Sequence, residues 1–264
     1  MTTFTKEEVV LQARNVNLSY EGKQILRDIN FEIKNITRPG MHQGQVISLI
    51  GKSGIGKTQL FKLLSGLQSP TSGEILIHKN RKVEPGDMGV IFQNYYLFEW
   101  RSVYKSLLLA AKKNPLLKGK EKDAIKQHAA DFNLSDHLQK YPQQLSGGQR
   151  QRVSIIQQLL KGSDFLLLDE PFSGLDVLVL DKVVELLLKV SVSDDLKTLI
   201  IVSHDIATSV AISDTVFILG EEKGKPGSTI VKEIDLIERE LAWERDIKSK
   251  KEFGETIGEI KGCL

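Results

Sequence analysis

The stretch Gly51-Lys52-Ser53-Gly54-Ile55-Gly56-Lys57-Thr58 fits the phosphate-binding pattern Gly-x-x-x-x-Gly-Lys-Ser/Thr. An apolar run at residues 46–50 precedes it and predicts a buried strand, whereas residues 59–65 have the leucine spacing of a helix. Glycines allow the backbone to curl, so that successive N–H groups and the start of the helix face one anion. The stretch therefore predicts a nucleotide site, and the flanking strand and helix disfavour a glycine-rich turn without a ligand.

The composition indicates one globular unit. Of the 264 residues 41% are apolar, which is enough for a large core. The 36 basic and 34 acidic side chains nearly balance, so charge gives no reason to expect nucleic acid as a partner. No apolar run approaches the roughly 20 residues of a membrane helix, and no secretory leader is evident. The single cysteine, Cys263, fits a reducing compartment, and we expect a cytosolic protein.

Further motifs follow the phosphate loop. They are Leu145-Ser146-Gly147-Gly148-Gln149-Arg150, Asp169-Glu170 after four apolar residues, Ser173-Gly174-Leu175-Asp176, and His204 after a second apolar run. Together with Gln93 and the upstream Tyr20, they resemble the motif set of the ATP-binding cassette (ABC) ATPase family, in family order, from about residue 10 to about residue 220. The Leu-Ser-Gly-Gly-Gln string is specific to that family. A P-loop kinase acting on a small molecule would leave this string unexplained.

The resemblance implies an α/β P-loop cassette with a mainly parallel core sheet, an N-terminal antiparallel β-subdomain and an inserted helical subdomain. We expect one ABC ATPase domain over residues 1–264, with residues 9–93 and 161–234 forming the β-subdomain and the RecA-like core. Residues 94–160 would form the helical subdomain and residues 235–264 a C-terminal surface segment. The mixed charges of residues 235–251 predict a solvated surface helix.

The nucleotide-binding candidates begin with the loop itself. Lys57 would reach the β and γ phosphates of ATP, and the Thr58 hydroxyl would take one position on Mg2+. Tyr20 resembles the aromatic residue that stacks on adenine, with a plain core tyrosine as the alternative. Its distance from the loop is unusually long because residues 35–44 look like an insertion. The candidates of the loop are Gly51, Lys52, Ser53, Gly54, Ile55, Gly56, Lys57, Thr58 and Gln59.

The catalytic candidates follow the ends of predicted strands, which meet at one edge of an open α/β sheet. Asp169 resembles a carboxylate that positions Mg2+ through a water, and Glu170 resembles the general base for the attacking water. Gln93 would touch both Mg2+ and that water. His204 resembles the residue that contacts the γ-phosphate and holds Glu170 in register. A helix cap, a surface glutamine and a surface histidine are the alternatives for Asp169, Gln93 and His204.

A second anion site is predicted where Ser146, Gly147, Gly148 and Gln149 open a helix. One nucleotide does not need two such sites on one chain. The resemblance implies that this site serves a partner subunit, so that two copies, or two similar chains, hold two ATP molecules head to tail. Asp176 resembles the residue that links the two sites across this interface.

The leading functional hypothesis is the ATPase subunit of a multi-chain ABC transporter. Residues 95–100, Tyr-Tyr-Leu-Phe-Glu-Trp, suit a docking groove for a membrane-spanning permease subunit and most resemble the nitrate, sulfonate and taurine importer branch. We expect a place on the cytoplasmic face of the membrane, import rather than export, and indirect cooperation with a substrate-binding protein. The alternatives are an exporter subunit and a soluble ABC ATPase of iron-sulfur cluster assembly. A core position for Tyr96, Leu97 and Phe98 competes with the groove.

Overall fold

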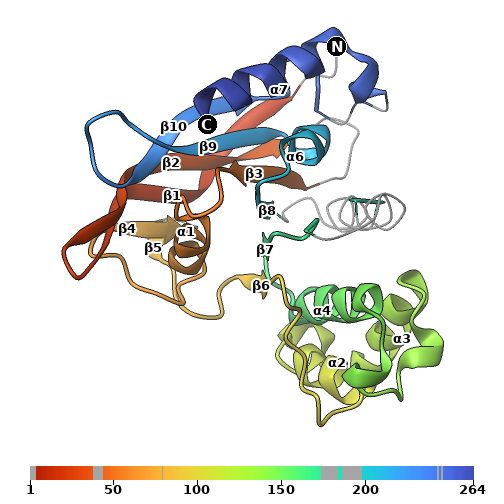
Figure 1. Cartoon of the computed structure of the whole chain (residues 1–264). Helices are drawn as coiled ribbons and strands as arrows, with labels where there is room; N and C mark the ends of the chain where they lie inside the picture. The colour runs from red at the N-terminus through yellow and green to blue at the C-terminus, as the bar shows by residue number, and fades with distance from the viewer. Residues whose placement is uncertain are drawn as a thin grey trace.

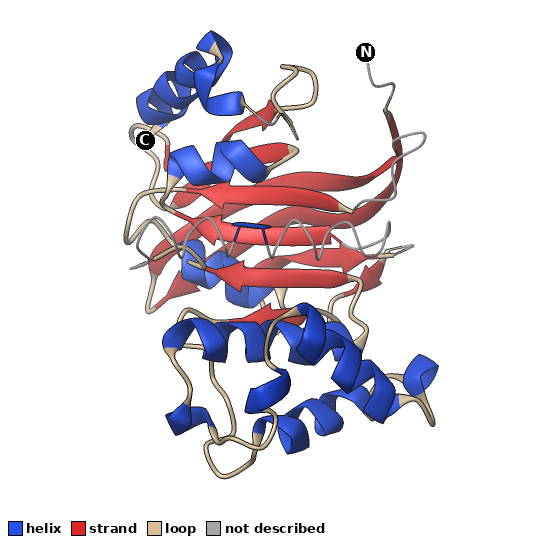
Figure 2. Ribbon diagram, turned by 90° about the vertical axis from the view of Figure 1, so that its right-hand side faces the viewer, coloured by secondary structure: helices blue, strands red, loops and turns tan. Residues whose placement is uncertain are grey.

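A mixed sheet runs through the protein (Figure 1, Figure 2) and contains ten strands within the described residues. The computed structural model describes residues 4–37, 44–78, 80–173, 184–185, 198–242, 244 and 246–264. Across the sheet the strand order is β5-β4-β1-β2-β10-β9-β3-β8-β7-β6. The strands are β1 Thr5–Tyr20, β2 Lys23–Thr37, β3 Gln45–Ile50, β4 Ser72–Ile77, β5 Arg81–Lys82, β6 Gly89–Ile91, β7 Phe165–Asp169, β8 Thr198–Ser203, β9 Thr215–Glu221 and β10 Ser228–Asp235.

The parallel part of the sheet consists of β6, β7, β8, β3 and β9. Every residue of β3, β7 and β8 is buried, which explains why these strands are continuous apolar runs in the sequence. Along β7, Leu166 and Leu168 pack with the helical cluster on one face, while Phe165 and Leu167 pack with helix α1 (Lys57–Leu64) on the other. Because these strands are parallel, their carboxyl ends lie at one edge.

The antiparallel part is built on the hairpin of β1 and β2. Its turn residues Glu21 and Gly22 both have positive φ, 48° and 80°, as the tight turns of twisted hairpins require. Strand β4 pairs with β1 on the other side. The antiparallel part is continuous with the parallel part, because Ser228 of β10 bridges to Leu26 of β2. The predicted α/β class, with a mainly parallel core and an antiparallel part, is confirmed.

A group of helices lies beyond β6 at one end of the sheet (Figure 1). It contains α2 Val103–Ala111, α3 Glu121–Asp131 and α4 Gly147–Lys161, with the 3-10 helices η1 Pro115–Leu117, η2 Ser135–His137 and η3 Pro142–Gln144 between them. The side chains of Ser102 and Ser146 cap the first turns of α2 and α4. The buried residues Leu107, Ile125 and Ile156 join the three helices in one core.

The predicted surface helix over residues 235–251 is wrong. The described residues of this stretch form turns and the 3-10 helix η4 Ile247–Ser249, and helix α7 (Lys251–Cys263) begins where the predicted one should end. Leu236 and Leu241 are fully buried beneath α7, together with Phe253 and Ile260 from the helix itself. Figure 1 shows α7 lying along β9 and β10. The segment therefore covers the sheet, with short helix α6 (Ile206–Ile212) beside it.

Candidate functional site

The phosphate loop connects the end of β3 to the start of α1. Gly54 and Gly56 have φ values of 80° and 106°, a left-handed conformation that favours glycine. A Cβ atom at Gly51 would lie 2.9 Å from the carbonyl oxygen of Leu219, so this position also requires glycine. The side chain of Lys57 is buried, and its Nζ donates hydrogen bonds to the carbonyl oxygens of Gly51 and Lys52 at 2.9 and 3.1 Å. The loop is thus a compact cradle with a positive charge inside it.

Asp169 ends β7 beside this loop. Its side chain is buried, and burial, followed by the neighbouring charge of Glu170, raises the pKa of its carboxyl group, while Lys57 opposes the shift. Within the described residues, the Oδ1 atom is buried without a hydrogen-bond partner. A buried carboxylate oxygen without a partner is costly unless a cation or water completes it. The position fits a residue that helps to hold a hard cation next to phosphates.

Glu170 adopts a strained backbone conformation for a residue with a Cβ atom. Its φ is 48°, and its N–H donates to the carbonyl oxygen of Val202 at 2.8 Å, which ties it to the neighbouring strand β8. The carboxylate contacts His204, whose Nδ1 lies 2.8 Å from Oε2. The other oxygen, Oε1, lies 3.5 Å from the Nζ of Lys57. Glu170 therefore stands between the lysine of the loop and the histidine after β8.

These residues line a cleft of about 510 Å³ at the carboxyl edge of the parallel strands. Gln93 lies on its wall and donates a hydrogen bond from Nε2 to the Ser173 hydroxyl at 3.2 Å. The lining residues are Tyr20, Ile25, Ser53, Gly54, Gly56, Lys57, Thr58, Gln59, Gln93, Glu170, Ser173 and His204. Ile25 and Ser173 were not candidates. Ser173 opens one of the recognised motifs and could have been proposed, whereas nothing in the local sequence distinguishes Ile25.

The Ser146 motif is absent from the lining of this cleft. Ser146 caps α4 by accepting a hydrogen bond from the N–H of Gln149 at 3.3 Å, and the Gln149 Oε1 atom accepts one from the N–H of Ser146 at 2.9 Å. A Cβ atom added to Gly147 or Gly148 would meet no atom of the described residues within 4 Å. The start of α4 is thus a separate nest of N–H groups. Asp176 lies outside the described residues.

The metal candidates offer oxygen atoms from three elements. Thr58 lies in the first turn of α1, Asp169 ends β7, and Gln93 follows β6. Within the part of the chain that the structure describes, no group of three His, Cys, Asp or Glu residues could hold a metal by itself. The set therefore fits Mg2+ only if phosphate oxygens and water complete the shell, as this ion prefers.

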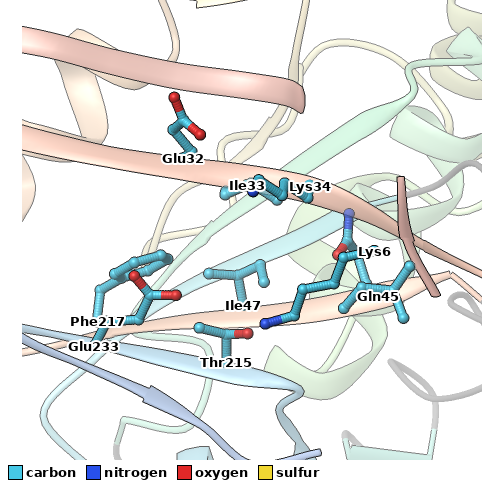
Figure 3. Close-up of a pocket in the computed structure, with 10 residues that line it drawn as sticks. Lys6, Glu32, Ile33, Lys34, Gln45, Ile47, Thr215, Phe217 and Glu233 are labelled. Carbon is cyan, nitrogen blue, oxygen red and sulfur yellow. The ribbon is translucent and has the colours of Figure 1, made fainter. Parts of the chain in front are cut away.

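A smaller depression of about 240 Å³ lies between β2 and the strands β3, β9 and β10 (Figure 3). Its walls combine apolar side chains such as Ile47 and Phe217 with charged ones such as Lys34 and Glu233. It contains none of the predicted site residues. Among the described residues, no helix is both long and apolar enough to cross a membrane.

A glycine loop between a buried parallel strand and a helix, with carboxylates at the end of another strand of the same parallel sheet, defines a P-loop nucleotide-binding protein. The family model described as ABC transporter matches residues 34–173. An uncharacterised ABC transporter ATP-binding protein of Bacillus subtilis is 36% identical over 221 residues, which cover 82% of this chain and 78% of the relative. The taurine import ATP-binding protein of Roseobacter denitrificans is 31% identical over 249 residues, or 91% and 87% of the two chains.

Solved structures agree with this assignment. The cbiO1 protein of Clostridium perfringens, part of the ABC transporter complex cbiONQ, superposes with a TM-score of 0.73 at 25% identity, covering 96% of both chains. A dimeric ATP-binding cassette bound to ADP and phosphate superposes with a TM-score of 0.68 at 25% identity, covering 86% of this chain and 98% of that one. The chain belongs to the ABC transporter family and is an ATP-binding, ATP-hydrolysing subunit of the transport type.

Proposed function

We propose that this chain binds ATP with Mg2+, closes on a second cassette around two ATP molecules, and drives import through separate membrane subunits. The observation that carries the chemical part is the row Lys57, Glu170 and His204, in which the glutamate contacts a cation of the phosphate loop on one side and an imidazole on the other. These contacts support a role for Glu170 as a base next to the terminal phosphate of a nucleotide bound in the loop.

The proposed roles follow from the atoms each side chain offers. Lys57 holds the β and γ phosphates by charge, and the N–H groups of residues 51–58 orient the phosphate chain. Glu170 accepts the proton of the attacking water, and His204 keeps its carboxylate turned toward that water. Gln93, at the wall of the cleft, orients the same water through its amide. Most of the catalysis in phosphoryl transfer comes from positioning and charge stabilisation, which this arrangement supplies.

We assign the Mg2+ site to Thr58, Asp169 and Gln93. Within the described residues, the buried Oδ1 of Asp169 has no hydrogen-bond partner, and this supports the assignment because a bound cation or its water would complete that oxygen. When bound, Mg2+ neutralises charge on the phosphate oxygens. The residues of the chain keep the phosphates in line with the water held by Glu170.

The separation of the Ser146 nest from the cleft supports a dimer. The N–H groups at the start of α4 form an anion site that this chain does not direct into its own cleft. A two-fold arrangement gives each cleft the nest of the other copy. The related cassette that carries ADP and phosphate is itself dimeric. We propose that Ser146, Gly147, Gly148 and Gln149 contact the γ-phosphate held by a second cassette, with Asp176 at the same interface.

The docking segment, residues 95–100, supports a membrane partner. Tyr96 and Trp100 are 72% and 73% exposed, and Phe98 is 39% exposed, so the core alternative for Tyr96 and Phe98 is wrong. Tyr95 and Leu97 are partly buried and pack against the helical core, which anchors the segment. Adjacent exposed aromatics are typical of binding hot spots. We propose that a permease subunit docks here, on the cytoplasmic face. The proposed direction of transport is import, as in the name of the taurine relative, with a substrate-binding protein as an indirect partner.

Light scattering on Glu170→Gln with ATP and Mg2+ tests the proposal. Removing the base leaves the phosphate contacts intact, so the variant should accumulate as an ATP-bound dimer. The matched control combines Glu170→Gln with Ser146→Arg, which fills the nest but leaves the cleft intact, and should bind ATP as a monomer. A Glu170→Gln protein that binds ATP and stays monomeric at every ATP concentration would contradict the dimer.

A further inference from the structure

The hydroxyl group of Tyr20 is held between two glutamine side chains. Gln68 donates a hydrogen bond from Nε2 to the Tyr20 oxygen at 2.6 Å, and the Tyr20 hydroxyl donates to Oε1 of Gln59 at 3.0 Å. The three residues come from the end of β1, the first turn of α1 and the loop that follows α1. The bonds therefore run in one direction, from amide to phenol to amide, and each one strengthens the next.

Gln59 connects this chain of hydrogen bonds to the phosphate loop. It follows Thr58 directly and lines the same cleft as Tyr20 and Lys57. Its Oε1 accepts the Tyr20 proton, and within the described residues its Nε2 group has no acceptor.

Tyr20 would be mobile without these bonds, because its side chain is 44% exposed. A ring with a free hydroxyl group can turn about its side-chain bonds. Binding a nucleobase then restricts this rotation, at a cost in conformational entropy. Two hydrogen bonds on the hydroxyl remove that freedom before the base arrives. They also make the position of the ring depend on α1, the helix that starts at Lys57.

We propose that Gln59 and Gln68 are positioning residues that set the plane of the Tyr20 ring for the nucleobase, and that Gln59 couples the base site to the phosphate loop. This inference rests on the proposed function, in which Tyr20 stacks on adenine. Affinity for ATP then depends on the hydroxyl group of Tyr20 as well as on its ring. Binding of a phosphate chain without a nucleobase does not depend on this hydroxyl group.

Calorimetric titration with ATP and with inorganic tripolyphosphate, both with Mg2+, separates these contributions. Tyr20→Phe and Gln68→Leu should each weaken ATP binding roughly 3- to 10-fold, the usual worth of one net hydrogen bond, and leave tripolyphosphate binding unchanged. Gln59→Ala should lower the ratio of ATP to tripolyphosphate affinity by a similar factor. The double variant Tyr20→Phe with Gln59→Ala should lower this ratio no further than Tyr20→Phe alone, because removing the hydroxyl group already breaks its hydrogen bond to Gln59.

The outcomes are distinct. The inference would be overturned if Tyr20→Phe bound ATP as tightly as the wild type does, or if this variant lost as much affinity for tripolyphosphate as for ATP. Effects of the two changes that multiply in the double variant would also overturn it. Equal melting temperatures across the series verify that the fold is intact. Lys57→Ala is the control for the proposed function and should lose affinity for both ligands. If Lys57→Ala binds both as the wild type does, the phosphate site itself is wrong, and the inference falls with it.

Discussion

The Nδ1 atom of His204 lies 2.8 Å from Oε2 of Glu170, although 34 residues separate the two in the chain. Strands β7 and β8 pair in parallel and end side by side, and this pairing brings the residues together. The imidazole side chain is 60% exposed toward the cleft, whereas the carboxylate is only 15% exposed. The histidine therefore covers the open side of the carboxylate and limits its rotation.

We predict that His204→Ala lowers the rate of ATP hydrolysis by roughly 10² to 10³ with little change in ATP affinity, because it releases Glu170 without touching the phosphate loop. The melting temperature should stay within experimental error, since the side chain is exposed. Steady-state ATPase assays and calorimetry check both statements. Asp205→Ala is the matched control, because Asp205 caps α6 through the Thr208 N–H at 3.1 Å, and its loss should cost about 1 kcal/mol of stability with hydrolysis retained. Equal rates for His204→Ala and wild type would contradict the role.

Phe98→Arg tests the docking segment. Phe98 is exposed and packs against Trp100 with ring centroids 5.4 Å apart, so an arginine can point to solvent. We expect an unchanged melting temperature and normal ATP binding, together with loss of co-purification with the membrane subunit. Leu116→Arg is the control, because Leu116 is 87% exposed in the helical group and lies outside the segment. Normal docking by a stable Phe98→Arg protein would remove the segment from the interface.

The local pattern of the sequence was sufficient for the parallel strands and the phosphate loop. Strands β3, β7 and β8 are buried on both faces, so their apolar runs can be recognised in the sequence without knowing which strands they pair with. Gly54 and Gly56 of the loop were likewise recognisable, because their positive φ values are a local requirement that favours glycine. The family motifs supplied the other candidates.

Contacts between distant segments could not be predicted in the same way. The charged stretch before α7 contains Leu236 and Leu241, which lie in the core. Turns place these two leucines there, so helical spacing in the sequence could not reveal them. The hydrogen bonds of Tyr20 join three segments that only the folded sheet brings together. Glu170, which has a positive φ, donates its backbone hydrogen bond to Val202, a partner on another strand.

Glu259 makes the attachment of α7 dependent on pH. Hydrogen bonds from Arg239, at 2.7 and 3.2 Å, and then an ion pair with Lys232 lower the pKa of its carboxyl group from 4.5 to about 2. A lowered pKa means that the stabilisation is present above the unfolded value and is lost as the pH falls through the folded value. Glu259→Gln should therefore lower the melting temperature at neutral pH, and the difference from wild type should shrink between pH 4.5 and about 2.

Thermal unfolding of both proteins across that range is the measurement. Glu255→Gln is the control on the same helix, because its pair with Lys251 is exposed and contributes little. A difference between Glu259→Gln and wild type that stays constant from neutral pH to about pH 2 would show that the two cations do not act through the charge of Glu259.

The central claim is that Glu170 is the base of an ATP hydrolase whose phosphates are held by Lys57. The most direct measurement is single-turnover ATP hydrolysis by Glu170→Gln, with ATP binding determined on the same sample. The amide keeps the size of the side chain but cannot accept the proton of water. We predict ATP binding close to that of the wild type and a rate lower by roughly 10² to 10⁴. Hydrolysis at the wild-type rate by a variant that binds ATP normally would contradict the account.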